Sequence, residues 1–184
     1  TPNIAARVGP PRLLFAAQAG APRKRLGDLI AAMPVVLKEL PDARLLVGGG
    51  GALPGRVPGD VSSAIDVIGT GELAEVPQRY RDATVTVLPS VDEAFGLVLV
   101  ESLACGTPVV GAASGGIPEI ITPGSEVGIL APAADPRGLA EAIISAVKLA
   151  CDPETPPRCV LHAQQWSWES VGPDHLAAYE AALR

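Results

Sequence analysis

The stretch DEAFGLVLVESLACGTPVV, residues 92–110, decides how the chain folds. Its central letters GLVLV alternate as a strand would, but Pro89 ends one apolar run before them and TPVVGA begins another after them. Two parallel strands need a crossover connection between them, and that connection is usually a helix. We therefore expect a helix over residues 96–105, with Gly106 as its C-cap.

Short apolar runs that end in glycine or proline lie on both sides of this stretch. They predict strands within residues 12–17, 43–51, 65–71, 83–90, 107–116 and 126–132. Helical patterns separate them: one at residues 26–40, which Pro34 should kink or divide, one that ends near Asp82, and one from an Asp135 cap to Ala150. This alternation predicts an α/β fold, a doubly wound, Rossmann-like parallel sheet with helices on both faces.

The C-terminal part of the chain is helical in pattern but carries several breaks. DPETPP, residues 152–157, should end the preceding helix. Two further helical segments follow, at residues 158–166 and 174–183. Gly172 and Pro173 should interrupt any continuous helix between these two segments.

Length and composition indicate one globular domain without a nucleic-acid surface. The chain has 184 residues, of which 48% are hydrophobic. Its formal net charge of -6 argues against binding nucleic acid, because phosphate backbones require clustered Lys and Arg. Arg23, Lys24 and Arg25 are the tight basic group of the sequence. From the residues alone, this triplet is either a phosphate contact or a solvated turn.

The cysteines are odd in number and irregularly spaced, at Cys105, Cys151 and Cys159, which favours a reducing compartment over a disulfide framework. Cys159 and His162 have the spacing of half a metal site. A second ligand pair is missing, so we expect neither a bound metal nor another cofactor.

No apolar stretch approaches the ~20 residues that span a bilayer, and the first residues lack the hydrophobic segment of a signal peptide. We therefore expect a cytoplasmic protein without a transmembrane segment. The chain begins at Thr1 rather than Met, which suggests a fragment, a processed chain or an excised domain.

Two carboxylates flank the start of the predicted helix. Its first amides, at residues 95–97 (Phe95, Gly96 and Leu97), should lie at the carboxyl edge of the sheet, where a helix N-terminus favours a diphosphate. Glu93 precedes the helix and Glu101 lies about 7 Å along its axis, so both could accept hydrogen bonds from hydroxyl groups, such as a ribose diol. Alternatively, Glu101 is a surface charge and Glu93 a loop charge. The apolar neighbours of Glu101 favour a largely buried carboxylate that needs partners.

The run EAFGLVLVESLACGTPVVGAASGGIPEII resembles the signature of the C-terminal, donor-binding half of the GT-B fold retaining glycosyltransferases of family 4. Its two glutamates fall on the family's E-x7-E pair, and the FG, CGTPVV and GGIPEI segments are unaltered. The similarity extends to the PRK loop, PDARLLVGGG, IGTGE, ADPRGLAEAI and WSWESV. The resemblance implies that residues 1–184 form a single nucleotide-sugar binding domain.

The resemblance also implies roles for individual residues. Glu101 should bind the ribose hydroxyls of the nucleotide, while Glu93 should lie near the donor sugar and stabilise the transition state electrostatically. Lys24 and the first amides of the predicted helix should hold the diphosphate. Gly69 and Thr70 should border the base. The expected reaction is a front-face, retaining transfer that the leaving phosphate assists.

The sequence departs from the family pattern after the first strand. Where the family commonly has Gly-Arg, this chain has Ala17 and Gln18. The phosphate site thus loses one expected cation, so either Arg23 or Arg25 compensates or the activity is weak or altered.

The N-terminal half of the family, which carries the acceptor site, is absent from this sequence. We therefore expect the chain to bind a nucleotide-sugar donor without transferring sugar efficiently, and its last helix to expose an apolar patch to the missing domain or another chain. Peripheral membrane association through that domain is compatible with this interpretation.

Other classes stay open at this point. A noncatalytic interaction or scaffold module could keep the same fold, and sugar-nucleotide epimerases and phosphorylases are further relatives. A phosphorylase would need a pyridoxal-binding lysine, for which the sequence offers no convincing candidate.

Overall fold

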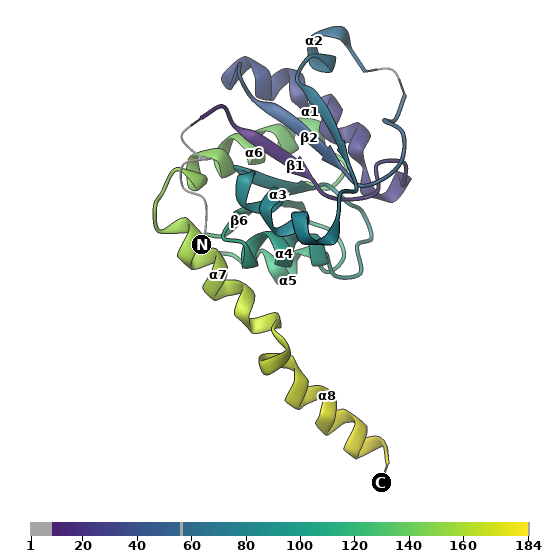
Figure 1. Cartoon of the computed structure of the whole chain (residues 1–184), viewed down its shortest axis with the longest axis vertical. Coiled ribbons are helices and arrows are strands. Elements are labelled where there is room, and N and C mark those ends of the chain that lie inside the picture. The colour runs from purple at the N-terminus through teal and green to yellow at the C-terminus, as the bar shows by residue number, and fades with distance from the viewer. Residues whose placement is uncertain (1–8, 56, 184) are drawn as a thin grey trace.

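The computed structural model describes residues 9–55 and 57–183 (Figure 1). Within them, six parallel strands form one sheet in the order β3-β2-β1-β4-β5-β6. The strands are β1 (Arg12–Phe15), β2 (Arg44–Gly48), β3 (Ile65–Gly69), β4 (Val85–Leu88), β5 (Val109–Ala112) and β6 (Gly128–Ala131). The prediction of a doubly wound, Rossmann-like α/β fold is confirmed.

Helices cover both faces of the sheet (Figure 1). The longer ones are α1 (Leu26–Glu39), α3 (Val76–Asp82), α4 (Leu97–Ala104), α6 (Pro136–Ala150), α7 (Thr155–Ala163) and α8 (Trp168–Ala182), and the short ones are α2 (Gly59–Ser62) and α5 (Ile117–Ile120). α1 packs against α6 on one face, whereas α4 contacts α3 and α7 on the other. The central strands are buried from both sides, which explains their continuous apolar runs.

The helix predicted from the crossover argument is confirmed as α4. It begins after Gly96, which has a φ of 104°, and ends at Ala104, with Gly106 following at a φ of 80°. Leu99 and Leu103 are fully buried between α4 and the sheet. Topology therefore outweighs the strand-like alternation of this segment.

α1 continues through Pro34 as one helix, so the expected division does not occur. Pro34 lies on the exposed side, while the opposite side buries Leu29, Met33 and Val36. Packing of this apolar side holds the helix together despite the missing backbone donor of proline.

The prediction of a break at Gly172 and Pro173 is wrong, because α8 runs through both residues. α8 begins after Ser167, whose hydroxyl accepts a hydrogen bond from the amide of Ser170 across 3.3 Å. Pro173 then lies in the second turn, where it removes one backbone donor. No described residue of α8 is buried, so water can hydrate the carbonyl that loses its partner.

α8 projects away from the rest of the molecule (Figure 1). It leaves several large apolar side chains exposed, among them Trp168 at 80%, Leu176 at 60% and Tyr179 at 69%. The prediction of an exposed apolar patch on the last helix is thus confirmed. Across the described residues, no helix combines the length and the hydropathy that crossing a bilayer requires.

Candidate functional site

The order of the strands changes direction between β1 and β4, which are neighbours at the centre of the sheet. The loops that follow them, residues 16–25 and 89–96, leave the sheet at its carboxyl edge. The amide of Val91 donates to the carbonyl of Arg23 across 3.0 Å and thereby joins the two loops. Because ligands of doubly wound sheets bind at this switch point, the fold places the candidate site here.

Glu93 is the charged centre of the two joined loops. It is 8% exposed, and the ammonium of Lys24 donates to its Oε2 across 2.5 Å. Nη1 of Arg23 lies 3.8 Å from Oε1, on a side chain that is 57% exposed. Arg25 instead pairs with Asp28, 2.8 Å away at the start of α1. The basic triplet is therefore divided, with two of its members directed at Glu93.

Opposing effects act on the pKa of Glu93. Burial raises it, but the hydrogen bond and the charge of Lys24, together with the charge of Arg23, bring the pKa below its ordinary value. Glu93 is therefore ionised at neutral pH. A carboxylate of this kind can orient cations and stabilise positive charge, whereas it is poorly suited to donating a proton.

The loop after β5 holds the backbone around Glu93 through hydrogen bonds. The amide of Gly116 donates to the carbonyl of Glu93 across 2.8 Å, and the amide of Asp92 donates to Oγ of Ser114 across 3.1 Å. Gly115 has a φ of 59°, and a Cβ added there would clash with the backbone of Glu93. The glycine pair therefore permits a close approach that larger residues would prevent.

The start of α4 lies beside this cluster at the same edge of the sheet. No side chain caps the helix. Phe95 is half-buried and its ring lies edge-on to Trp166, with 6.2 Å between centroids, while the Leu97 side chain is exposed. The amides at the beginning of α4 thus have no side-chain partner, and they follow Glu93 closely in the chain.

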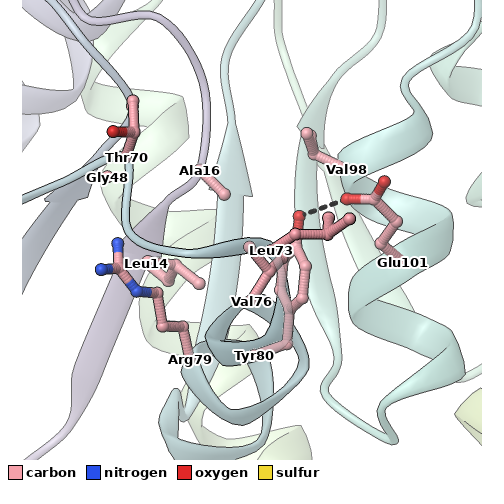
Figure 2. Close-up of a pocket in the computed structure, with 11 residues that line it drawn as sticks. Leu14, Ala16, Gly48, Thr70, Leu73, Val76, Arg79, Tyr80, Val98 and Glu101 are labelled. Atoms are coloured by element: carbon pink, nitrogen blue, oxygen red, sulfur yellow. Dashed lines mark hydrogen bonds between the residues drawn. The ribbon is translucent and has the colours of Figure 1, made fainter.

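A cavity of about 270 Å³ lies between α3 and α4, beside the ends of β1, β2 and β3 (Figure 2). Its polar groups come from the turn after β3, from α3 and from α4. It is lined by Leu14, Ala16, Gly48, Gly49, Thr70, Leu73, Val76, Arg79, Tyr80, Val98 and Glu101. The cavity therefore combines an apolar floor with few polar groups, as small-molecule sites do.

Glu101 reaches this cavity from α4, but it is an exposed residue. The expectation of a largely buried carboxylate is therefore wrong. α4 buries Leu99 and Leu103 against the sheet, which turns Glu101 towards the open cavity instead. Its partner is the hydroxyl of Tyr80, which donates to Oε2 across 2.7 Å (Figure 2).

Tyr80 is 2% exposed and belongs to a small core cluster with Leu14, Leu46 and Ala83. Burial raises the pKa of its phenol far above the ordinary value, and the hydrogen bond and charge of Glu101 raise it further. Its hydroxyl therefore remains protonated and acts as a donor to Glu101 at any pH near neutrality.

Arg79, the neighbour of Tyr80 on α3, supports the opposite wall of the cavity (Figure 2). Its Nη1 donates to the carbonyl of Gly69 across 2.7 Å, and a Cβ added to Gly71 would clash with the guanidinium. Arg79 thus holds the turn that carries Thr70, which is exposed beside the cavity.

The structure divides the predicted site residues between two groups at the carboxyl edge of the sheet. Glu101 and Thr70 line the cavity, whereas Glu93 is not among the lining residues and is grouped with Lys24 and Arg23. Gly69 ends β3 and anchors the turn through Arg79, and Gln18 is exposed in the loop after β1.

Arg79 and Tyr80 are polar lining residues that the sequence analysis missed, because their segment gave only a helical pattern. One signal was available. A tyrosine among apolar residues of a short helix needs a partner for its hydroxyl, and such a partner is often a polar group of the site.

The proposed half metal site has a structural explanation. Cys159 is buried with its Sγ 3.9 Å from the carbonyl of Val127, and Nε2 of His162 lies 2.8 Å from the carbonyl of Ile120. In the part of the chain that the structure describes, no three potential ligand residues gather in a way that could hold a metal ion.

The strand order defines a Rossmann-like α/β domain. The joined loops and the cavity place its candidate site near the switch point of the sheet. The family model described as "Glycosyl transferases group 1" matches residues 10–148. The chain belongs to this family.

Curated relatives share this similarity. The chain is 39% identical over 151 residues to the D-inositol 3-phosphate glycosyltransferase of Thermobifida fusca, a match that covers 75% of this chain and 34% of that protein. It is 34% identical to a GDP-mannose-dependent monoacylated alpha-(1-6)-phosphatidylinositol monomannoside mannosyltransferase of Corynebacterium glutamicum, covering 82% of this chain and 42% of that protein. The chain thus spans well under half the length of these relatives.

Solved structures show the same architecture. Sucrose-phosphate synthase from Thermosynechococcus elongatus superimposes with a TM-score of 0.79 at 27% identity, covering 99% of this chain and 49% of that one. Anabaena Alr3699/HepE in complex with UDP gives a TM-score of 0.78 at 20% identity, covering 96% of this chain and 50% of that one.

Proposed function

We propose that this chain is the donor-binding domain of a retaining glycosyltransferase, which moves a sugar from a nucleoside-diphosphate sugar to an acceptor. The acceptor-binding domain lies outside this chain in the proposal, which the short span over the curated relatives supports. The observation that carries the proposal is the pairing of a carboxylate-lined cavity with a cation-lined loop at one sheet edge.

The nucleoside occupies the cavity in this proposal. Glu101 accepts hydrogen bonds from the ribose hydroxyls, and Gly69 and Thr70 border the base. The diphosphate lies at the start of α4, where the first amides and Lys24 face it. Anabaena Alr3699/HepE, which has the same fold, was solved in complex with UDP, and this supports a nucleoside diphosphate as the ligand.

Glu93 serves the donor sugar in the proposal. The bond from the anomeric carbon to the diphosphate breaks, and the acceptor oxygen bonds on the same face. The acceptor proton passes to a phosphate oxygen of the leaving group. Ionised Glu93 stabilises the positive charge that develops on the sugar ring, and it also orients Lys24.

Arg23 compensates for the cation that Gln18 does not supply. It lies beside Glu93 and is largely exposed, so its guanidinium is free to turn towards a phosphate. Arg25 is held by Asp28 at the start of α1 and is directed elsewhere. In this proposal cations and amides, rather than a metal ion or another cofactor, neutralise the diphosphate.

Calorimetric titration of the chain with UDP, GDP and ADP tests the proposal. We expect binding of at least one of them, and Glu101→Ala should weaken it by about tenfold to a hundredfold, because hydrogen bonds to a charged group are lost. Glu141→Ala, which removes an exposed glutamate on α6, should bind as the unchanged chain does. No heat with any of the three nucleotides would overturn the proposal and favour a noncatalytic module.

A further inference from the structure

Tyr80 is a buried residue whose hydroxyl donates a hydrogen bond to Glu101. The tyrosine is packed with Leu14, Leu46 and Ala83, and its hydroxyl donates to Glu101 at the cavity. Glu101 itself is exposed, and a free glutamate side chain of this kind samples many rotamers. The hydrogen bond of 2.7 Å selects the rotamer that points into the cavity before any ligand arrives.

A network of buried hydroxyl groups fixes the distance between α3 and α4. Oγ1 of Thr107 donates to the carbonyl of Tyr80 across 2.7 Å. The hydroxyl of Ser102 lies 3.0 Å from the carbonyl of Thr107 and 2.8 Å from the hydroxyl of Thr86. Since Ser102 follows Glu101 directly, both partners of the Tyr80–Glu101 hydrogen bond are anchored by the same network.

The hydrogen bond leaves Glu101 with enough capacity for a diol. An ionised carboxylate offers about four lone-pair sites, and Tyr80 occupies one of them on Oε2. Oε1 and the remaining site of Oε2 can accept two hydroxyl groups side by side. A vicinal diol is the ligand group that matches this arrangement.

We propose that Tyr80 is a positioning residue that acts through Glu101, and that it makes the site select nucleotides carrying both ribose hydroxyls. This inference rests on the proposed function. Without the Tyr80 hydroxyl, the ligand itself must order the Glu101 side chain, and the entropy lost in doing so weakens binding. This loss affects only ligands that hydrogen-bond to Glu101. A nucleotide that lacks both hydroxyls is therefore insensitive to Tyr80.

The test compares a nucleoside diphosphate with its 2′,3′-dideoxy form on the unchanged chain and on Tyr80→Phe. The nucleotide is whichever of UDP, GDP and ADP binds. We expect Tyr80→Phe to weaken binding of the ribose form by roughly three- to tenfold and to leave the dideoxy form within about twofold. In a Glu101→Ala background, Tyr80→Phe should have no further effect on either form.

Arg79→Lys is the matched control, because it changes the same helix one position away without touching Glu101. It should affect both nucleotide forms alike. Equal affinities of Tyr80→Phe and the unchanged chain, an equal loss for both forms, or the same selective loss in Arg79→Lys would overturn the inference while nucleotide binding itself stands. Failure of the unchanged chain to bind any nucleotide would overturn the proposed function and the inference together.

Discussion

Glu93 and Glu101 are carboxylates of one sheet edge, but two different kinds of structure hold them. Glu93 is buried, and the cation of Lys24 and the backbone of the loop after β5 fix it. Glu101 is exposed, and a neutral hydroxyl on a packed ring fixes it. The first arrangement makes the carboxylate of Glu93 contribute to the stability of the fold in a pH-dependent way. The second leaves the carboxylate of Glu101 accessible to a ligand.

Substitution of Gly115, which contacts the backbone of Glu93, should cause the largest loss of stability among these variants. Gly115→Ala places a Cβ against the backbone of Glu93 at a φ of 59°, so we expect a loss of about 3 to 5 kcal/mol in the free energy of unfolding. Gly124→Ala is the matched control. It has a φ of 78° but open space around it, and should cost about 1 kcal/mol. Denaturant unfolding measures both, and equal losses would contradict the close-approach argument.

Lys24→Met tests the ion pair of Glu93. Removing the cation leaves a buried carboxylate without its main partner, and we expect a loss of about 2 kcal/mol at neutral pH. Arg137→Met breaks an exposed pair with Glu141 and should cost less than about 0.5 kcal/mol. If the two variants unfold at the same denaturant concentration, the Lys24–Glu93 pair has no special role in stability.

The pH dependence of stability should follow Glu93. Because its pKa is lower in the folded chain, its contribution is present above the ordinary glutamate pKa and disappears as the pH falls through the lowered value. Unfolding measured between neutral pH and about pH 3 should therefore show a smaller acid loss in Glu93→Gln than in the unchanged chain. An identical acid loss in both chains would contradict this assignment.

Glu101→Gln should change stability at neutral pH by less than about 0.5 kcal/mol, because the side chain is exposed and the amide can still accept from Tyr80. Glu101 should therefore contribute much less to stability than the Lys24–Glu93 ion pair does. Thermal unfolding measures it, and a loss as large as that of Lys24→Met would show that Glu101 is part of the structural framework instead.

Arg23→Ala and Arg25→Ala form a pair that sharpens the comparison within the basic loop. Arg23→Ala should weaken nucleoside diphosphate binding by roughly three- to tenfold and reduce its salt dependence, since an exposed cation near the phosphates is lost. Arg25→Ala should change binding by less than about twofold, because that guanidinium pairs with Asp28. The reverse order would assign the compensating cation to Arg25.

Topology made the framework of the site predictable from sequence. Pro89 and the TPVV segment required a crossover helix, so the position of α4 and of its first amides followed from connectivity alone. Glycine and proline marked the ends of the strands, which placed the loops of Glu93 and Lys24 at the same edge. These features depend on local chemistry and on few possible connections.

Side-chain surroundings were less predictable. The burial of Glu101 was misjudged because its apolar neighbours face the sheet while the carboxylate faces a cavity bounded by α3, far away in sequence. Tyr80 was missed because its segment gave only a helical pattern, which did not show that its hydroxyl reaches Glu101 on α4. The break at Pro173 was wrong, because α8 runs through this residue and exposes to water the carbonyl that loses its backbone donor.

A crystal structure of the chain with a bound nucleoside diphosphate tests the central claim most directly. The account predicts that both ribose hydroxyls lie within hydrogen-bond distance of the Glu101 carboxylate while Tyr80 still donates to Oε2. The phosphates should lie at the start of α4 beside Lys24. A nucleotide bound with its ribose away from Glu101, or outside the cavity between α3 and α4, would contradict the account.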